Sequence, residues 1–436
     1  MFKTILPLGV VIFFRFFGLF IVLPVLSIYL ITMPNATPLL IGLAMSGYAL
    51  TQLIFQAPFG YLSDKIGRKS VIVLGTLIFV AGSIVCYISQ DIYMLIAGRL
   101  LQGAGAVAAV ITALVSDLIK EEARSKAMAL IGGSIAIGFT ISMVAGPTIS
   151  DIYGINSLFL ISGILGILSL FIVIFSVPNP PQVIHHYNKK PDIKKILLNP
   201  SLITMNITNF LQKSVMTFTF VLVPIYLIGK FGWDKGELYM IYLPATILGV
   251  IAMGPASIIA EKKEKPKLPL IVGIVLFIGA YLFMASEIEY LFIIGIFLFF
   301  TGFNVHEPIM QSLASKLSKV HQKGISLGIF NTFGYLGTFT GGLTGAFLIK
   351  NSSLVNFSIV FAIIGILWLV LIVKMKNPAH SKNIYIPLDE LKEKPTKNQM
   401  KKINGILEWY TNTTQKILII KYDSTKTKEK DIKSQL

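Results

Sequence analysis

The stretch GYLSDKIGRK, residues 60–69, is a short cationic turn between two long apolar segments. Residues 5–59 before it carry a single charge, Arg15, and residues 71–89 after it carry none. A helix that spans a bilayer needs about 20 mostly apolar residues. The stretch therefore predicts a turn between two membrane helices, and its basic residues predict that the turn faces the cytosol.

The composition of the whole chain agrees with a membrane protein. Of 436 residues, 54% are apolar and only 14% are charged, which leaves more apolar surface than a soluble core can hide. The net charge is +17, but the lysines lie in short loops and the C-terminal tail, so we expect no nucleic-acid partner. Cys86 is the single cysteine, and no metal-ligand spacing, cofactor motif or nucleophile–base pairing occurs. We therefore expect no metal, no cofactor and no enzymatic reaction.

Twelve segments are long and apolar enough to be membrane helices. They form two blocks of six around one polar stretch, which predicts a duplicated transporter. The predicted helices cover residues 5–31, 38–59, 70–89, 92–116, 127–150, 155–177, 201–229, 238–260, 268–286, 290–313, 325–349 and 355–374. The predicted domains are a six-helix bundle over 1–177, a cytosolic linker over 178–200, a second bundle over 201–375 and a cytosolic module over 376–436.

The distribution of Lys and Arg predicts the orientation of the chain. The loops after every second helix hold seventeen of these residues and the opposite loops hold three. Cytoplasmic loops carry the excess of Lys and Arg in membrane proteins. We therefore expect both termini in the cytoplasm.

The tail after Lys376 has a different pattern from the rest of the chain. Residues 382–388, 405–411 and 416–423 predict short strands, and TNTTQ between the last two predicts a hairpin turn. Met400, Ile403 and Ile406 recur at helical spacing, and EKDIKSQL at the end predicts another helix. The tail therefore predicts a small α+β module, with a disordered lysine-rich tail as the alternative.

Charged side chains inside a bilayer are costly, so each one is a candidate functional residue. Glu307 is the only carboxylate well inside any predicted helix, which makes it the candidate proton site. Burial favours its protonated form and a nearby cation favours its ionised form, so a cationic substrate could displace the proton. The alternative is a carboxylate held permanently by Arg15 or Lys213 as a pair between helices. The other ionisable candidates for proton coupling or the substrate cavity are Arg15, Arg99, Lys213 and His306, the last of which fits a core histidine equally well.

Several amide side chains within the predicted helices could line the same cavity. Gln52 and Gln56 share one helix face, and Asn206, Asn209 and Lys213 share another. Gln52 and Asn209 are the amides that we assign to the cavity. The alternative is that such amides only hold helices together, which is common in membranes.

Three sequence motifs follow one another along the first half. The turn 60–69 fits G-x-x-x-D-K/R-x-G-R-K/R, and Arg99, Gln102, Gly103 and Gly105 fit R-x-x-Q-G-x-G in the fourth helix. Gly146 and Pro147 fit the Gly-Pro end of a helix-5 motif, in which Ser142, Ser150 and Asp151 replace glycines. With these motifs in register and a small module at its end, the chain resembles the major facilitator superfamily over nearly its whole length. It is most similar to the drug/proton antiporter group that carries a C-terminal ferredoxin-like domain.

This resemblance implies an all-α, twelve-helix fold of two six-helix halves followed by a ferredoxin-like α+β module. It also implies a cytosolic gate that locks the outward-open state, and a proton-coupling role for Arg99. The gate residues are Gly60, Asp64, Lys65, Gly67, Arg68 and Asp117. The second half keeps only a remnant of this motif, GPASIIAEKKEK at 254–265, so the gate is predicted to be asymmetric.

The predicted function is proton-coupled export of small apolar or cationic compounds by alternating access, in the bacterial inner (plasma) membrane. The alternatives are an uptake symporter of the same fold and a non-transporting sensor that signals through the module. The expected partners are a small-molecule substrate, protons and the lipid bilayer, and self-association through the module is a further prediction.

Overall fold

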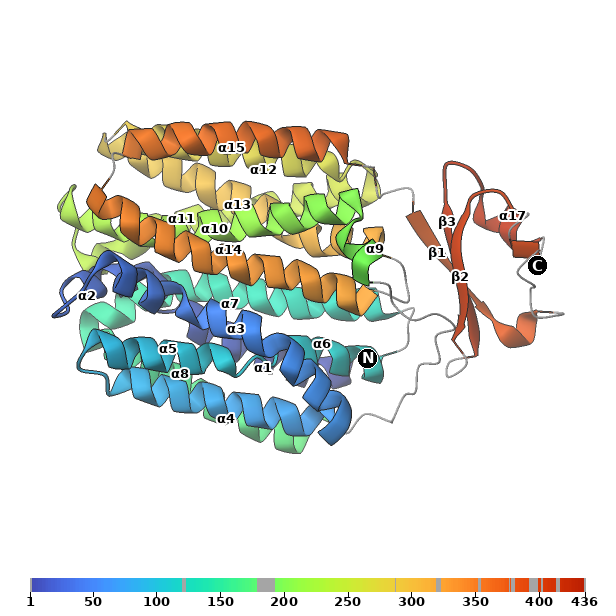
Figure 1. The fold of residues 1–436 in the computed structure, drawn as a ribbon, viewed down its shortest axis with the longest axis horizontal. Helices are drawn as coiled ribbons and strands as arrows, with labels where there is room; N and C mark the ends of the chain where they lie inside the picture. Colours follow the sequence, from blue (N-terminus) through green and yellow to red (C-terminus); the bar gives the residue numbers. More distant parts are fainter. Residues whose placement is uncertain are drawn as a thin grey trace.

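Long helices form a bundle with a small sheet at one end in the computed structural model (Figure 1). The structure describes residues 2–119, 123–178, 193–286, 288–318, 323–351, 354–375, 377, 381–391, 399–400, 403–412 and 416–434. Most of the predicted linker, residues 179–192, and the centre of the predicted hairpin turn, residues 413–415, lie outside the described residues. The division into domains at 177, 200 and 375 stays a prediction.

The first half of the bundle contains six membrane-length elements, two of which are broken. The first element breaks at Ile21–Val22 and the fourth at Gly105–Val107, where one continuous helix was expected. Gly105, at the second break, lies so close to the carbonyl of Gly75 that a Cβ would be 2.1 Å from that oxygen. The elements are α1 (Phe2–Phe20) with α2 (Leu23–Ile31), α3 (Pro38–Ile66), α4 (Arg68–Tyr87), α5 (Ile92–Ala104) with α6 (Ala108–Leu118), α7 (Arg124–Tyr153) and α8 (Asn156–Ser176).

The second half follows the short helix α9 (Ile193–Leu197) and also contains six membrane-length elements. Its second element starts as a 3-10 turn and ends as a π-helical turn. The elements are α10 (Pro200–Gly229), η2 (Lys235–Leu238) with α11 (Tyr239–Ser257) and η3 (Ile258–Lys262), α12 (Lys267–Ala285), α13 (Glu289–Leu317), α14 (Lys323–Asn351) and α15 (Leu354–Lys374).

Eleven helices of the described chain are long and apolar enough to cross a membrane. The twelfth predicted span forms α14, which has 29 residues but is less apolar than the others because it is rich in Gly and Thr. Its glycines let it approach α10 closely: a Cβ on Gly337 would lie 2.1 Å from the carbonyl oxygen of Phe210. Close packing of α14 therefore accounts for its low hydropathy.

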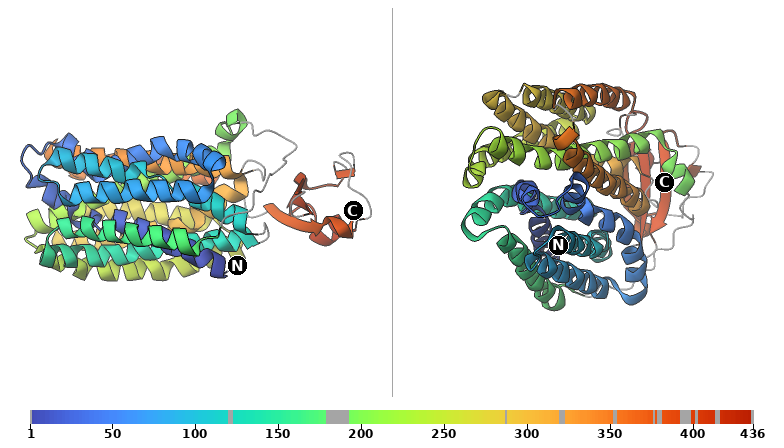
Figure 2. Two further views of the ribbon diagram at one scale, coloured as in Figure 1. Left: turned by 90° about the horizontal axis from the view of Figure 1, so that it is seen from below. Right: turned by 60° about the vertical axis from the view of Figure 1, so that its left-hand side comes forward.

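The two halves meet along two pairs of helices, α3 with α14 and α7 with η2 and α11. Helix α2 also packs against α10 across this boundary. We call the end of the bundle next to the sheet the module end and the opposite end the far end. Helix α1 begins at the module end, and the sheet lies beyond it (Figures 1 and 2).

The C-terminal module contains a three-stranded antiparallel sheet in the order β1-β3-β2. Its strands are β1 (Ser381–Pro387), β2 (Ile406–Asn412) and β3 (Ile417–Asp423), and their bounds lie within one residue of the predicted ranges. The pairing of β2 with β3 is interrupted by a bulge early in β2. Short helical segments are η6 (Leu388–Glu390) and α17 (Glu429–Lys433), the latter within the predicted last helix. Met400 and Ile403 pack with Leu418 and Ile420 in its core. The described module is therefore folded, which excludes the disordered alternative.

Candidate functional site

Glu307 lies on α13 and forms an ion pair with Lys213 of α10. The Lys213 ammonium donates to both carboxylate oxygens, at 3.0 Å to Oε1 and 2.8 Å to Oε2. Gln212 donates a further hydrogen bond of 3.0 Å to Oε2. The two charged side chains keep 22% and 31% of their surface exposed, so the pair is accessible rather than sealed in the core. Of the two predictions for Glu307, the structure shows the carboxylate paired with a basic residue of another helix.

This ion pair lies at the boundary between the two halves. The Lys213 ammonium is 5.0 Å from the centre of the Phe303 ring, a cation–π distance. Phe303 stacks on Phe139 of α7, with ring centres 5.3 Å apart. Phe139 also contacts Phe20 of α1 and Phe220 of α10. The carboxylate and ammonium therefore lie beside an aromatic cluster to which both halves contribute.

His306 points away from Glu307 despite being its neighbour in the sequence. Its imidazole is fully buried, and its Nε2 lies 2.8 Å from the carbonyl oxygen of Leu270. Phe277 and Trp368 pack edge-on against the ring. These contacts give His306 the environment of a core histidine that holds α12, α13 and α15 together.

Arg15 is buried inside the first half, with 4% of its surface exposed. None of its three side-chain nitrogens has a hydrogen-bond acceptor among the described residues. The guanidinium lies 5.1 Å from the centre of the Phe79 ring, beside a small cavity that Thr76 and Ser169 also line. Arg15 is therefore a buried charge whose described contacts are mainly aromatic and apolar, and it does not contact Glu307.

Arg99 is also fully buried, but its hydrogen bonds are satisfied. It donates to Gln102 Oε1 at 2.8 Å and to the backbone carbonyls of Ala44 and Met45 on α3. Its guanidinium lies 4.6 Å from the centre of the Tyr48 ring. Arg99 therefore ties α5 to α3 within one half, as a helix-packing residue would.

The two predicted cavity amides have different environments. Asn209 donates to the carbonyl oxygen of Phe330 at 2.7 Å and so ties α10 to α14. Gln52 is 1% exposed, and neither of its polar atoms has a described partner. Among the predicted coupling and cavity residues that the structure describes, only Lys213 and Glu307 bond to each other.

The motif glycines and proline of the fourth and fifth predicted helices lie where backbones touch. A Cβ on Gly103 would lie 1.9 Å from the carbonyl oxygen of Tyr48. A Cβ on Gly146 would lie 2.2 Å from the carbonyl oxygen of Ile21, one residue before Pro147 within α7. These residues therefore serve close helix packing inside the first half.

The predicted gate residues cluster at the module end. Arg68 forms ion pairs with Asp64 at 2.6 Å and with Asp117 of α6 at 3.1 Å. Gly67 has φ +94°, which suits glycine, and ends α3. Lys65 does not join the ion pairs that the structure describes but lies over the Tyr61 ring.

The gate cluster is confined to the first half in this structure. Asp64 keeps 62% of its side chain exposed. No described heavy atom lies within 4 Å of a Cβ built on Gly60, and the same holds for Gly324 and Gly328 of α14. Gln56 of α3 nevertheless donates a hydrogen bond of 3.4 Å to the carbonyl oxygen of Gly328, so α3 and α14 also touch at the module end.

The same boundary is tightly packed at the far end. A Cβ on Gly42 would lie 2.9 Å from Leu343, and a Cβ on Gly342 would lie 2.5 Å from the side chain of Ser46. Ser46 also donates a hydrogen bond across the boundary to the carbonyl oxygen of Phe339 at 3.1 Å.

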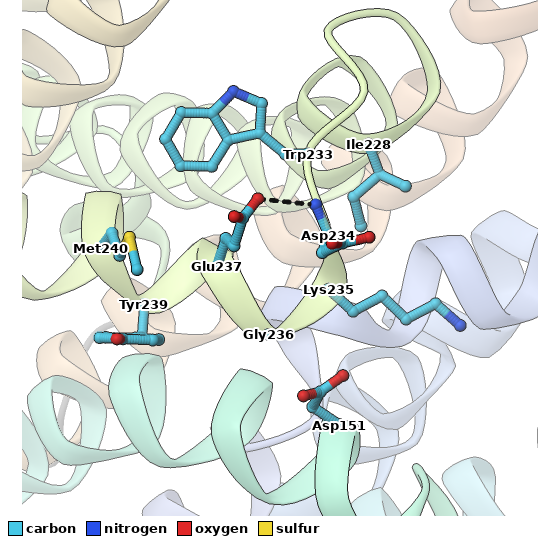
Figure 3. Close-up of a pocket in the computed structure, with 9 residues that line it drawn as sticks. All are labelled: Asp151, Ile228, Trp233, Asp234, Lys235, Gly236, Glu237, Tyr239 and Met240. Atoms are coloured by element: carbon cyan, nitrogen blue, oxygen red, sulfur yellow. Dashed lines mark hydrogen bonds between the residues drawn. The ribbon is translucent and has the colours of Figure 1, made fainter.

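The second boundary, between α7 and η2, is also closed at the far end. Asp151 points from the end of α7 toward Gly236, and a Cβ there would lie 2.6 Å from its Oδ2 (Figure 3). A groove of about 560 Å³ lies beside this contact, lined also by Trp233, Lys235 and Glu237. The replacement of a motif glycine by Asp151 is thus matched by a glycine on the facing helix.

Three lysines at the module end donate to the last carbonyls of membrane helices, a role that sequence patterns did not reveal. Lys69 at the start of α4 bonds to Ile174 and Val177 at the end of α8. Lys267 at the start of α12 bonds to Val373 at the end of α15. Because α4 and α12 are the third elements of their halves and α8 and α15 the sixth, the two contacts are related by the internal repeat.

The third lysine, Lys421, belongs to the module. It is 8% exposed and donates to the carbonyl oxygens of Lys316 and Ser318 at the end of α13, at 2.6 Å each. Lys382 of β1 forms an ion pair of 2.8 Å with Glu264. These contacts attach the module to the second half, and its self-association stays a prediction.

The family model described as Major Facilitator Superfamily matches residues 8–342 and 267–409. The inner membrane transport protein YajR of Escherichia coli strain K12 is 34% identical, over 98% of this chain and 96% of that protein. The multidrug resistance protein MdtL of Shigella dysenteriae serotype 1 is 28% identical, over 66% of this chain and 76% of that protein. A D-xylose–proton symporter structure matches with a TM-score of 0.72 at 14% identity, over 86% of this chain and 98% of that one.

The relative YajR is named a transport protein, in agreement with the expectation of a multi-pass membrane protein that is not an enzyme. The fold match and the small three-stranded module agree with the predicted architecture. The chain therefore belongs to the major facilitator superfamily of membrane transporters.

Proposed function

We propose that this protein is a proton-coupled secondary transporter that exports small compounds by alternating access. The observation that carries the proposal is the accessible Lys213–Glu307 pair at the boundary between the halves. Glu307 is the only carboxylate well inside a membrane helix, and a group that cycles a proton must reach water in at least one state.

The packing between the halves supports alternating access. The far end is held by tight glycine contacts at Gly42 and Gly236, whereas at the module end α3 reaches α14 through a longer hydrogen bond of 3.4 Å from Gln56 to the carbonyl oxygen of Gly328. A transporter that rocks closes one end while the other opens. The structure fits a state that is closed at the far end and loosened at the module end.

The orientation of the chain adds a direction to this state. The excess of Lys and Arg in the loops of the module end supports a cytosolic location for that end. The name of the relative YajR supports the inner membrane. With this orientation, the structure corresponds to an inward-facing state that can bind substrate from the cytosol.

The resemblance favours the export of apolar or cationic compounds as the function. The relative MdtL is named a multidrug resistance protein, which agrees with export. The aromatic cluster around Phe139 and Phe303 suits an apolar cargo. A proton symporter is the second candidate, because protonation of Glu307 would release Lys213 for a new partner.

Flux in proteoliposomes tests the proposal. Vesicles that contain the protein should move protons when a defined pH gradient and a candidate cargo are both present. Glu307→Gln should lose this coupled flux, whereas Glu390→Gln, the same change on an exposed module residue, should keep it. Coupled flux that is equal in wild type and Glu307→Gln would disprove the role of Glu307. The sign of the proton flux separates antiport from symport.

A further inference from the structure

The charge balance inside the membrane helices is positive, which bears on the cargo. Arg15, Arg99 and Lys213 are cationic, whereas Glu307 is the one carboxylate well inside a helix. Arg99 is solvated by carbonyl oxygens, and Arg15 has no acceptor among the described residues. Unpaired charge of one sign in a low-dielectric interior attracts the opposite sign. The interior is therefore electrostatically suited to an anion.

The geometry of the ion pair points in the same direction. Both oxygens of Glu307 accept from Lys213, and Oε2 accepts from Gln212 as well. A cationic cargo that approached Glu307 would have to displace the resident ammonium. The site would then hold two cations and one carboxylate, a net charge of +1 in a region where unbalanced charge is costly.

We infer that the site formed by Lys213, Gln212 and Glu307 binds an amphiphilic organic anion, whose carboxylate or similar group takes the place of Glu307 on Lys213 when Glu307 accepts a proton. The inference rests on the second candidate of the proposed function, proton symport, because anion and proton are bound together, and it names the substrate class.

The exchange balances without any further reactant. A proton from the medium adds to a Glu307 oxygen, and the hydrogen bonds that Lys213 made to that carboxylate are remade to the anion. The ammonium offers three donors, enough for a carboxylate while Gln212 stays on the neutral carboxyl group. The site is neutral before and after, with one proton bound for each anion. By linkage, anion binding and protonation favour each other by the same factor.

The groups around the pair suit an aromatic or apolar body on the anion. Phe303 lies under Lys213, and Phe139 of the other half stacks on Phe303. The charged or titratable groups that the described contacts place near Glu307 are Lys213 and the neighbouring His306, whose Nε2 lies against Leu270 instead. From α7, the described contacts to this cluster are those of Phe139.

Proton exchange on binding tests the inference with three probes that share one ring system: 2-naphthoate, 2-naphthamide and 2-naphthylmethylammonium. The purified full-length protein is mixed with each probe at saturating concentration in weak buffer near neutral pH, and proton uptake is followed with an indicator dye. We expect 2-naphthoate to bind with uptake of about one proton per molecule, as linkage requires. The other two probes should cause no uptake.

Variants separate Lys213 from the rest of the protein. Lys213→Met should weaken 2-naphthoate binding roughly tenfold or more, because a hydrogen-bonded charge pair is lost. Lys213→Arg should restore binding, and Lys235→Met, the same change as Lys213→Met on an exposed far-end lysine, should have no effect. Glu307→Gln, which mimics the protonated form, should bind 2-naphthoate without proton uptake.

Three outcomes would overturn the inference: no proton uptake with 2-naphthoate, proton release with the ammonium probe, or equal 2-naphthoate binding in wild type and Lys213→Met. The proposed transport function fails on a different measurement. If vesicles show no coupled flux but the purified protein still takes up protons on binding 2-naphthoate, the anion site is supported and the transport function is not. If coupled flux occurs only with the ammonium probe, the transport function is supported and the inferred preference for an anion is disproved.

Discussion

Gly236→Ala should open the far end of the transporter. The backbone of Gly236 is not left-handed, so alanine there adds a methyl group and no conformational strain. That methyl carbon would lie 2.6 Å from Oδ2, 2.9 Å from Cγ and 3.4 Å from Oδ1 of Asp151. Either the carboxylate turns away or α7 and η2 separate.

The size of the effect follows from how far Asp151 can yield. Inserting a methyl group into close packing costs about 1–3 kcal/mol. Because the crowded atoms are the end of a short side chain at the surface, the lower part of this range applies. A cost of about 1.4 kcal/mol lowers the ratio of far-end-closed to far-end-open molecules about tenfold.

Distances between spin labels measure this ratio. Labels at Tyr153 on α7 and Tyr290 on α13 are both exposed and lie in different halves. Cys86, the single cysteine, is replaced by serine so that only these positions react. Gly236→Ala should enlarge the long-distance population, and adding Asp151→Ala should restore the original distribution. An unchanged distribution, or a shift that Asp151→Ala does not reverse, would refute the contact as a determinant of closure.

Three further predictions concern stability, measured by thermal unfolding of the purified protein. Gly103→Ala should lower the melting temperature severely or prevent folding, because a backbone carbonyl stands 1.9 Å from the new Cβ, whereas Gly60→Ala should leave it unchanged; equal melting of the two would contradict the packing described. Arg15→Met should raise the melting temperature or leave it unchanged, since a charge inside a membrane helix costs about 2.5–3.5 kcal/mol, and a clear decrease would reveal a partner for the guanidinium. Lys69→Met and Lys267→Met should each lower the free energy of unfolding by a similar amount, about 0.5–1.5 kcal/mol, because each variant loses hydrogen bonds to the terminal carbonyls of a helix. The two positions are related by the internal repeat, so an effect of only one variant would argue against that symmetry.

The fold was predictable because its determinants are local in sequence. Apolar length and loop charge located the helices without any knowledge of contacts. The close approach of Gly105 to the carbonyl of Gly75 was not predictable, since the two residues belong to different helices. The same limit applies to α14, because the sequence does not show that its glycines pack against α10.

The site was only partly predictable for the same reason. Helical spacing placed Asn209 and Lys213 on one face, but it could not show which residue Lys213 meets across the bundle. Arg15 and Lys213 were equal candidates to pair with Glu307 on sequence grounds, and the structure selects Lys213. His306 is adjacent to Glu307 in sequence but points toward α12, because successive residues of a helix lie about 100° apart.

The gate at the module end differs between the halves in a way that the internal repeat makes clear. In the first half, Asp117 at the end of the fourth element pairs with Arg68. The corresponding end of α13 carries Lys316, which pairs with Glu261 of the remnant motif, so the second half has its own ion pair with the charges exchanged. The terminal carbonyls of α13 are then occupied by Lys421 of the module. Since α13 also carries Glu307, the module bonds to the helix that carries both the proposed proton site and the ion pair of the remnant motif.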